Sequence, residues 1–99
     1  MSIWSNLSSK VNIDEKALQL RALSCWILFE LAKTDQEITG YIQKYGVSSP
    51  EMLEQMIREK RVDVHPAWED SIDWSNLQEY RKELLDNLAS TGGIIKNDR

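Results

Sequence analysis

Residues 22–32 read ALSCWILFELA and form the most apolar run in the chain. Before this run, apolar residues follow one face of a helix, and from Ala22 onward they surround it. A helix that is apolar on nearly all sides must be covered on nearly all sides. The run therefore predicts a central helix, either buried in the fold or shared with a second subunit. Cys25 and Trp26 are accordingly expected in the core.

The same run gives no sign of a membrane segment. It is flanked by Arg21 and Lys33 and is too short to span a bilayer. It also lies too deep in the chain, without a basic leader, for a signal peptide. Cys25 is the only cysteine, which excludes an internal disulfide and a multi-cysteine zinc site. We expect a soluble, cytoplasmic protein.

The chain has the length and composition of one globular domain. It contains 99 residues, of which 41% are hydrophobic and 28% are charged. We expect an N-terminal arm over 1–12, a single helical domain over 13–91 and a flexible tail over 92–99. The arm carries Ile3, Trp4 and Leu7, and these either dock on the body as one apolar turn or belong to a loose segment.

Local signals divide the domain into helices, and no segment alternates as a strand would. Asp14 suits a helix start, Thr34 with Glu37 has the spacing of a capping box, and Gly46 suits a left-handed helix end. Ser48 or Ser49, followed by Pro50, favours a further helix start, as does Ser75 with Gln78. The prediction is an all-α fold, a compact bundle of four main helices (about 14–33, 35–45, 49–60 and 74–90) with a short helical turn near 66–71.

A second distinctive stretch, VDVHPAWEDSIDW, covers residues 62–74. Residues 62–80 contain five acids and no Lys or Arg, whereas the rest of the chain is near neutral. Tryptophan is enriched at binding hot spots, and an acidic rim steers a basic partner. Trp74 continues an apolar stripe and is expected in the core. The predicted partner-binding residues are Trp4, Asp63, His65, Trp68, Glu69, Asp70 and Asp73.

Metal binding and catalysis are less consistent with this stretch. His65 and Glu69 stand four residues apart, but a single histidine cannot supply the two or three imidazoles common in zinc sites. Counted from Asp70, the twelfth position is Arg81, where a calcium loop needs a glutamate. No glycine-framed nucleophile motif and no phosphate loop are present. We therefore expect no metal site, no cofactor and no catalytic residue, and the protein is not expected to be an enzyme.

These observations favour a non-catalytic protein-interaction module, such as a small adaptor, inhibitor or regulatory subunit. Its acidic-aromatic surface would bind a protein with a basic surface. The helix containing 22–32 needs more cover than three other helices supply, so a homodimer through this run is also expected. In the competing interpretation the protein is a monomer, and the N-terminal arm closes the gap.

The alternative function is a helix-turn-helix DNA-binding regulator using residues 35–60. A helix ending at Gly46, a short turn and a serine-capped second helix resemble that motif in outline. Ile42 stands where the motif has a small residue, and Glu51 and Glu54 near the entry end would face phosphates. The net charge of −4 also argues against general nucleic-acid binding.

Overall fold

The computed structural model describes residues 2–11 and 13–97, with side chains described as far as Thr91. Within these residues the chain is helical apart from short connections, and it contains no strand. The helices are α1 (Ile3–Val11), α2 (Glu15–Tyr45), α3 (Pro50–Arg58) and α4 (Val64–Asn97). The predicted all-α class is confirmed.

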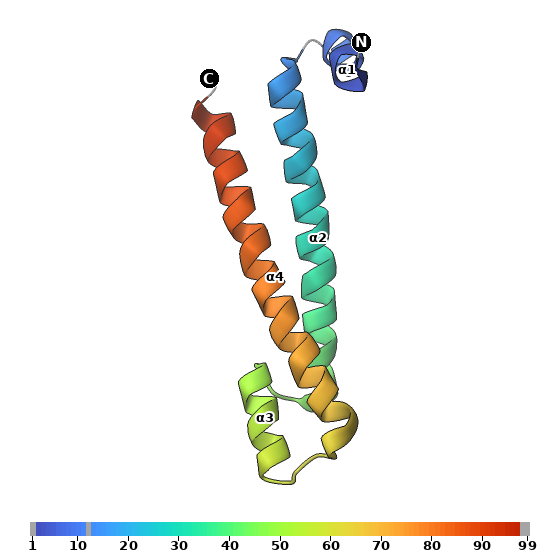
Figure 1. The fold of residues 1–99 in the computed structure, drawn as a ribbon, viewed down its shortest axis with the longest axis vertical. Helices are drawn as coiled ribbons and strands as arrows, with labels where there is room; N and C mark the ends of the chain where they lie inside the picture. Colours follow the sequence, from blue (N-terminus) through green and yellow to red (C-terminus); the bar gives the residue numbers. More distant parts are fainter. Residues whose placement is uncertain (1, 12, 98–99) are drawn as a thin grey trace.

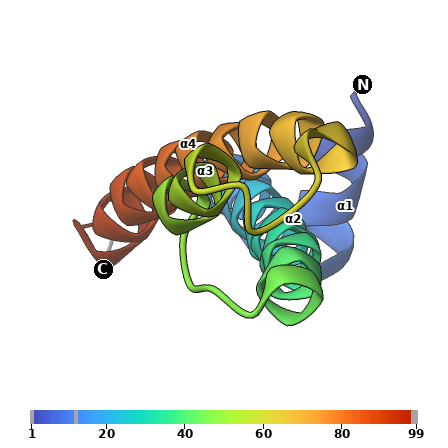
Figure 2. The ribbon, with the colours of Figure 1, turned by 90° about the horizontal axis from the view of Figure 1, so that it is seen from below.

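The molecule is a long helical hairpin (Figure 1). α2 and α4 run side by side in opposite directions, α3 packs on α4 at the closed end, and α1 lies at the other end beside the start of α2 (Figures 1 and 2). The molecule measures 61 × 24 × 18 Å. Its radius of gyration is 19.5 Å, against about 13 Å for a compact domain of this length. The predicted compact four-helix bundle is therefore wrong.

The predicted helices 14–33 and 35–45 are one continuous helix, α2. Asp14 caps its start, where the side chain accepts a hydrogen bond from the backbone N–H of Ala17 at 3.2 Å. Thr34 lies inside the helix and is only 3% exposed, so its capping-box spacing with Glu37 does not start a helix. No proline lies in α2, and one long helix buries the apolar positions on both sides of Thr34 against α4.

The α2–α4 contact follows a seven-residue repeat. Most of the buried and half-buried positions of α2 recur at spacings of three and four: Ala17, Leu20, Ser24, Ile27, Leu31, Thr34, Ile38, Tyr41 and Tyr45. A row of α4 follows the same spacing: Ala67, Asp70, Trp74, Leu77, Arg81, Leu84, Leu88 and Thr91. This mean spacing of 3.5 keeps one face of each helix against the other along the whole hairpin, as in a coiled coil. We call these two rows the seam.

Two apolar clusters hold the hairpin together. The upper cluster, along the middle of the hairpin, is small: Ile27, Leu31 and Leu84, with Tyr80 and Leu88 packed on them. The lower cluster, where three helices meet, is larger. It contains Leu53, Ala67 and Trp74, with Ile38, Tyr41, Tyr45, Val47, Ile57 and Val62 packed around them. The closed end is therefore the best-packed part of the molecule.

The turn between α2 and α3 follows the local signals in the sequence. Gly46 has φ 69°, and its N–H donates to the carbonyl of Ile42 at 2.8 Å, as expected of a left-handed helix end. Ser49 caps α3, because its Oγ accepts from the N–H of Met52 at 3.2 Å. Both predictions are confirmed.

α4 combines two predicted elements. His65 is extended, with φ −109° and ψ 131°, as expected of a residue before proline, and it bends the chain at the start of α4. Beyond it the helix is continuous, so the separate turn at 66–71 is wrong and Ser75 starts no helix. The helix continues through Asn97 into the predicted flexible tail. Residues 98–99 of that tail lie outside the described residues.

The predicted burial of residues 22–32 is also wrong for a single chain. Ile27 and Leu31 face α4 and are buried, but Phe29 is 65% exposed and Trp26 is 51% exposed. Cys25, expected in the core, is exposed as well. The reason is geometric: one neighbouring helix covers only one side of α2, whereas the apolar residues surround it.

Candidate functional site

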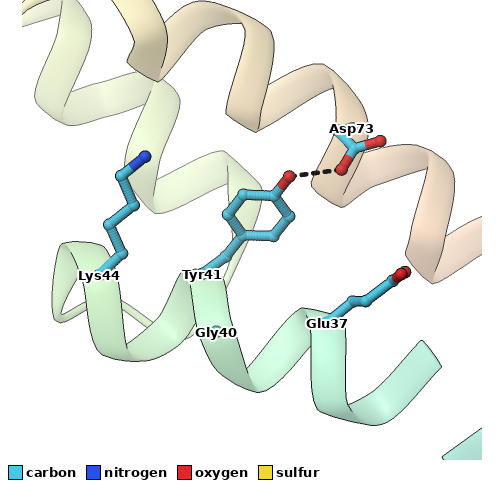
Figure 3. Close-up of a pocket in the computed structure, with 5 residues that line it drawn as sticks. All are labelled: Glu37, Gly40, Tyr41, Lys44 and Asp73. Atoms are coloured by element: carbon cyan, nitrogen blue, oxygen red, sulfur yellow. Dashed lines mark hydrogen bonds between the residues drawn. The ribbon is translucent and has the colours of Figure 1, made fainter. Parts of the chain in front are cut away.

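The closed end of the hairpin gathers the acids of the VDVHPAWEDSIDW stretch against the last turns of α2. The hydroxyl of Tyr41 donates a hydrogen bond to Asp73 (Figure 3), and that of Tyr45 donates to Asp70. The ammonium of Lys44 also donates to Asp70, with a distance of 2.7 Å between Nζ and Oδ2. Two of the acids predicted to meet a partner thus also tie α4 to α2.

These contacts shift the titration of the groups that make them. The hydrogen bond to Asp73, followed by burial, raises the pKa of Tyr41 well above its ordinary value. Burial, followed by the hydrogen bond to Asp70, raises the pKa of Tyr45. Burial opposes ionisation of Asp70, but hydrogen bonds from Lys44 and Tyr45 hold its pKa below the ordinary value. The phenols therefore remain donors and Asp70 remains an anion at neutral pH.

A hollow of about 350 Å³ lies beside these contacts (Figure 3). Glu37, Gly40, Tyr41, Lys44 and Asp73 line it. Glu37 and Asp73 lie toward one side of the hollow and Lys44 toward the other (Figure 3). The Tyr41 ring stacks on buried Trp74, with ring centroids 5.8 Å apart. Lys44 is the one basic residue among the five, and it lies away from the carboxylates of Glu37 and Asp73. The side of the hollow near these two carboxylates can therefore accept a cationic group.

Two parallel rows of side chains run along the first turns of α4, and Trp68 in the first row lines a second hollow with Glu54, Ile57 and Arg58 of α3. Trp68 and Ile72 stand one helical turn apart and are 50% and 47% exposed. Glu69 and Asp73, also one helical turn apart, form a second row about 100° further around the helix. We call these four residues, with Asp63, His65 and Asp70, the acidic-aromatic surface.

His65 and Glu69 make the remaining polar contact of this surface. The imidazole Nδ1 lies 2.7 Å from Oε1 of Glu69, and both side chains are largely exposed. A hydrogen bond to the backbone N–H of Glu69 itself, followed by the contact with His65, lowers the pKa of Glu69. Asp63 is exposed in the connection before α4. In the described part of the chain, no group of three or more His, Cys, Asp or Glu side chains is placed to hold a metal ion.

The structure brings six of the seven predicted residues together at the closed end. Trp4 is the exception: it is half-buried on α1, which lies at the opposite end of the hairpin (Figure 1). There α1 is tied to α2 by a hydrogen bond of 2.9 Å from Ser5 Oγ to Glu15. Trp74, expected in the core, is fully buried.

Three residues of the closed end were not among the predicted site residues: Glu37, Tyr41 and Lys44. One signal pointed to Tyr41 and its neighbour Tyr45. They occupy successive turns of an apolar stripe, and a phenol hydroxyl placed against a packed helix needs an acceptor. The acids of 62–74 were the available acceptors.

The helix-turn-helix alternative uses the same region. Its second helix would be α3, which buries Leu53 completely against the lower cluster and leaves Glu51 exposed in its first turn. Its first helix is not a separate element, because it is the last third of α2. DNA binding remains a prediction.

Residues 1–91 match the sequence model of the family described as "Uncharacterized protein MJ0235 family", and the chain belongs to that family. No curated protein matches the chain, and no solved structure matches it. No helix within the described residues has both the length and the apolar character needed to cross a membrane.

Proposed function

We propose that this member of the MJ0235 family is a non-catalytic protein-interaction module, a small adaptor, inhibitor or regulatory subunit, whose acidic-aromatic surface binds a protein with a basic surface. The observation that carries the proposal is the half-exposed indole of Trp68, one helical turn from Ile72, on the part of α4 that also carries the exposed carboxylates of Glu69 and Asp73. An exposed tryptophan with an apolar neighbour and a charged rim has the composition of a binding hot spot.

The charges of this surface would act first. Asp63, Glu69 and Asp73 are exposed, and Glu37 adds a fourth carboxylate beside the hollow. Lys44 offsets mainly Asp70, with which it is paired. A negative patch of this kind raises the rate of encounter with a basic protein, and added salt weakens the effect.

Burial of the indole would then supply affinity and a fixed orientation. Covering the exposed half of Trp68 removes about 100 Å² of aromatic surface from water, worth about 2.5 kcal/mol at 25 cal/mol per Å². Burying Ile72 in the same contact adds to this. A lysine or arginine of the bound protein would fit between the carboxylates of Glu37 and Asp73, over the ring of Tyr41.

Affinity capture from the native lysate tests the proposal when single-site variants are compared. Trp68→Ala removes the indole, and Glu69→Lys reverses one exposed charge without touching the Asp70 contacts. Met52→Ala is the matched control, because Met52 is an exposed apolar residue of α3 outside the surface. We expect the parent and the control to retain the same protein and both surface variants to lose it. Equal capture by all four would refute the proposed surface.

We also propose a cytoplasmic location. The chain has one cysteine, and its thiol is exposed. Free thiols of this kind persist in a reducing compartment. Fractionation of the source cells, followed by immunodetection, tests this, and recovery from an extracytoplasmic fraction would contradict it.

A further inference from the structure

We propose that α2 carries, on the side turned away from α4, the interface through which two copies of this chain form a homodimer. The proposed interface consists of Ala22, Cys25, Trp26 and Phe29, called here the outer face of α2. At 100° per residue, Cys25 and Phe29 lie about half a turn around the helix from Ile27, which faces α4. The acidic-aromatic surface is at the closed end of the hairpin, so the two proposals concern different parts of the molecule.

The outer face is apolar and uncovered in the single chain. All four residues are exposed, and Phe29 has the larger exposed fraction of its two aromatic residues. α1 contacts α2 nearer its start and leaves them open. Isolated apolar residues are ordinary on a protein surface, but four neighbours on successive turns form a continuous patch.

The amount of exposed surface is large enough for a stable dimer. The chain exposes 7162 Å², whereas a compact monomer of 11.5 kDa exposes about 5,800 Å². The excess is roughly 1,350 Å², and a standard interface buries about 800 Å² on each subunit. A second copy seated on α2 therefore uses surface that a compact fold of this mass would already have buried.

The upper half of the hairpin also lacks a core of ordinary size. Within the described residues its buried apolar side chains are Ile27, Leu31 and Leu84. Two helices held together by so few buried residues have marginal stability, and helical bundles usually complete their core with four helices. When two hairpins meet through α2, each α2 is covered on both sides, which satisfies the apolar residues that surround it.

The occupant is a second copy because the outer face is complementary to itself. A two-fold axis passing between Cys25 and Trp26 makes the two α2 helices antiparallel. Ala22 then faces Phe29 of the second copy, and Cys25 faces Trp26 of the second copy, so each small side chain receives a large one. None of the four positions is charged, so two chains of net charge −4 meet without opposing like charges there.

The first test is the mass of the protein in solution, measured by light scattering during size-exclusion chromatography at about 100 µM. We expect a dimer, twice the chain mass of 11.5 kDa. Phe29→Glu should raise the dissociation constant at least roughly 100-fold, because an ionised carboxylate would be buried without a partner. Met52→Glu places the same charge on an exposed apolar residue of α3 and should remain dimeric. A monomeric parent, or dimers of all three proteins, would overturn the proposal.

The second test reads the interface in the unaltered parent and so does not depend on how Phe29→Glu folds. The proposed axis passes beside Cys25 in both copies. The two Cys25 residues therefore lie close together across the interface, within disulfide reach. Mild oxidation of the parent should convert most of the protein to a covalent dimer on a non-reducing gel. Cys25→Ser should abolish the band. The arrangement would be contradicted by a parent that stays monomeric on the gel, or by a control thiol at Met52 (Met52→Cys in Cys25→Ser) that cross-links as well as the parent.

Discussion

Replacing Trp74 with alanine should remove a large part of the stability of the molecule. Trp74 is 0% exposed, stacks on Tyr41 and packs with Leu53 and Ala67 in the lower cluster. Truncating a buried tryptophan to alanine costs about 3–5 kcal/mol, through lost apolar burial and the cavity left behind. Small domains have about 5–15 kcal/mol in total, and an elongated hairpin belongs toward the lower end of that range. Trp74→Ala should therefore be partly unfolded at 37 °C.

The matched comparison is Trp68→Ala, which removes the same side chain from a half-exposed position. At 25 cal/mol per Å², the buried half, about 100 Å², accounts for about 2.5 kcal/mol. Trp74→Phe provides a third point. In the described part of the chain the indole Nε1 of Trp74 is buried without a hydrogen-bond partner, so phenylalanine loses ring volume but also removes an unpaired donor. We expect it to cost about 1–2 kcal/mol.

Urea denaturation followed by far-ultraviolet circular dichroism measures these differences. All variants should be compared at one protein concentration, because dimerisation would make the midpoint depend on it. The expected order of destabilisation is Trp74→Ala, then Trp74→Phe and Trp68→Ala. A Trp74→Ala protein that loses less than about 1 kcal/mol, or no more than Trp68→Ala, would show that the lower cluster is not the main core.

Three further changes test single features of the structure. Ser49→Ala should cost about 1 kcal/mol of unfolding free energy by removing the cap of α3, with Ser48→Ala, next to it, as the control; equal effects would contradict the capping hydrogen bond. Gly46→Ala should cost about 1 kcal/mol because its φ of 69° is unfavourable for residues with a Cβ; an unchanged midpoint would show another backbone geometry. Because the pKa of Asp70 is lowered in the folded state, its ionisation stabilises the fold above the ordinary aspartate pKa, and this stabilisation is lost as the pH falls through the lower, folded value. The loss of stability on going from pH 7 to pH 3 should therefore be smaller in Asp70→Asn than in the parent, and an equal or larger loss would disagree with this assignment.

Helix ends could be predicted where a residue acts on its own backbone. Asp14, Gly46, Ser49 and His65 each have the conformation or hydrogen bond that their residue type favours. The same reasoning failed at Thr34, where the spacing of a capping box occurs inside α2. Thr34 is buried where α2 packs against α4, at residues about 50 positions later in the sequence. Local sequence patterns contain no information about such a tertiary contact.

The error about residues 22–32 has a different origin. The apolar pattern shows which sides of α2 need cover, but it does not say whether the cover comes from the same chain. Within one chain, α4 covers the side of Ile27 and Leu31 and leaves Trp26 and Phe29 open. In the candidate site, the sequence left open whether Trp68 is exposed or buried, and the structure has it 50% exposed. The hydrogen bonds of Asp70 and Asp73 could not be predicted, because they depend on how α4 is aligned with α2.

That alignment is specified by polar cross-links rather than by the repeat of the seam. In addition to the contact of Lys44 with Asp70, these cross-links include four pairs, each between a residue of α2 and one of α4: Tyr45 with Asp70, Tyr41 with Asp73, Asp35 with Arg81, and Glu30 with Tyr80. Apolar rows spaced by seven would still interdigitate after a slip of one heptad, but such a slip would separate all four pairs together. The polar pairs therefore fix a single register of α4 against α2, because only one alignment of the two helices forms every pair.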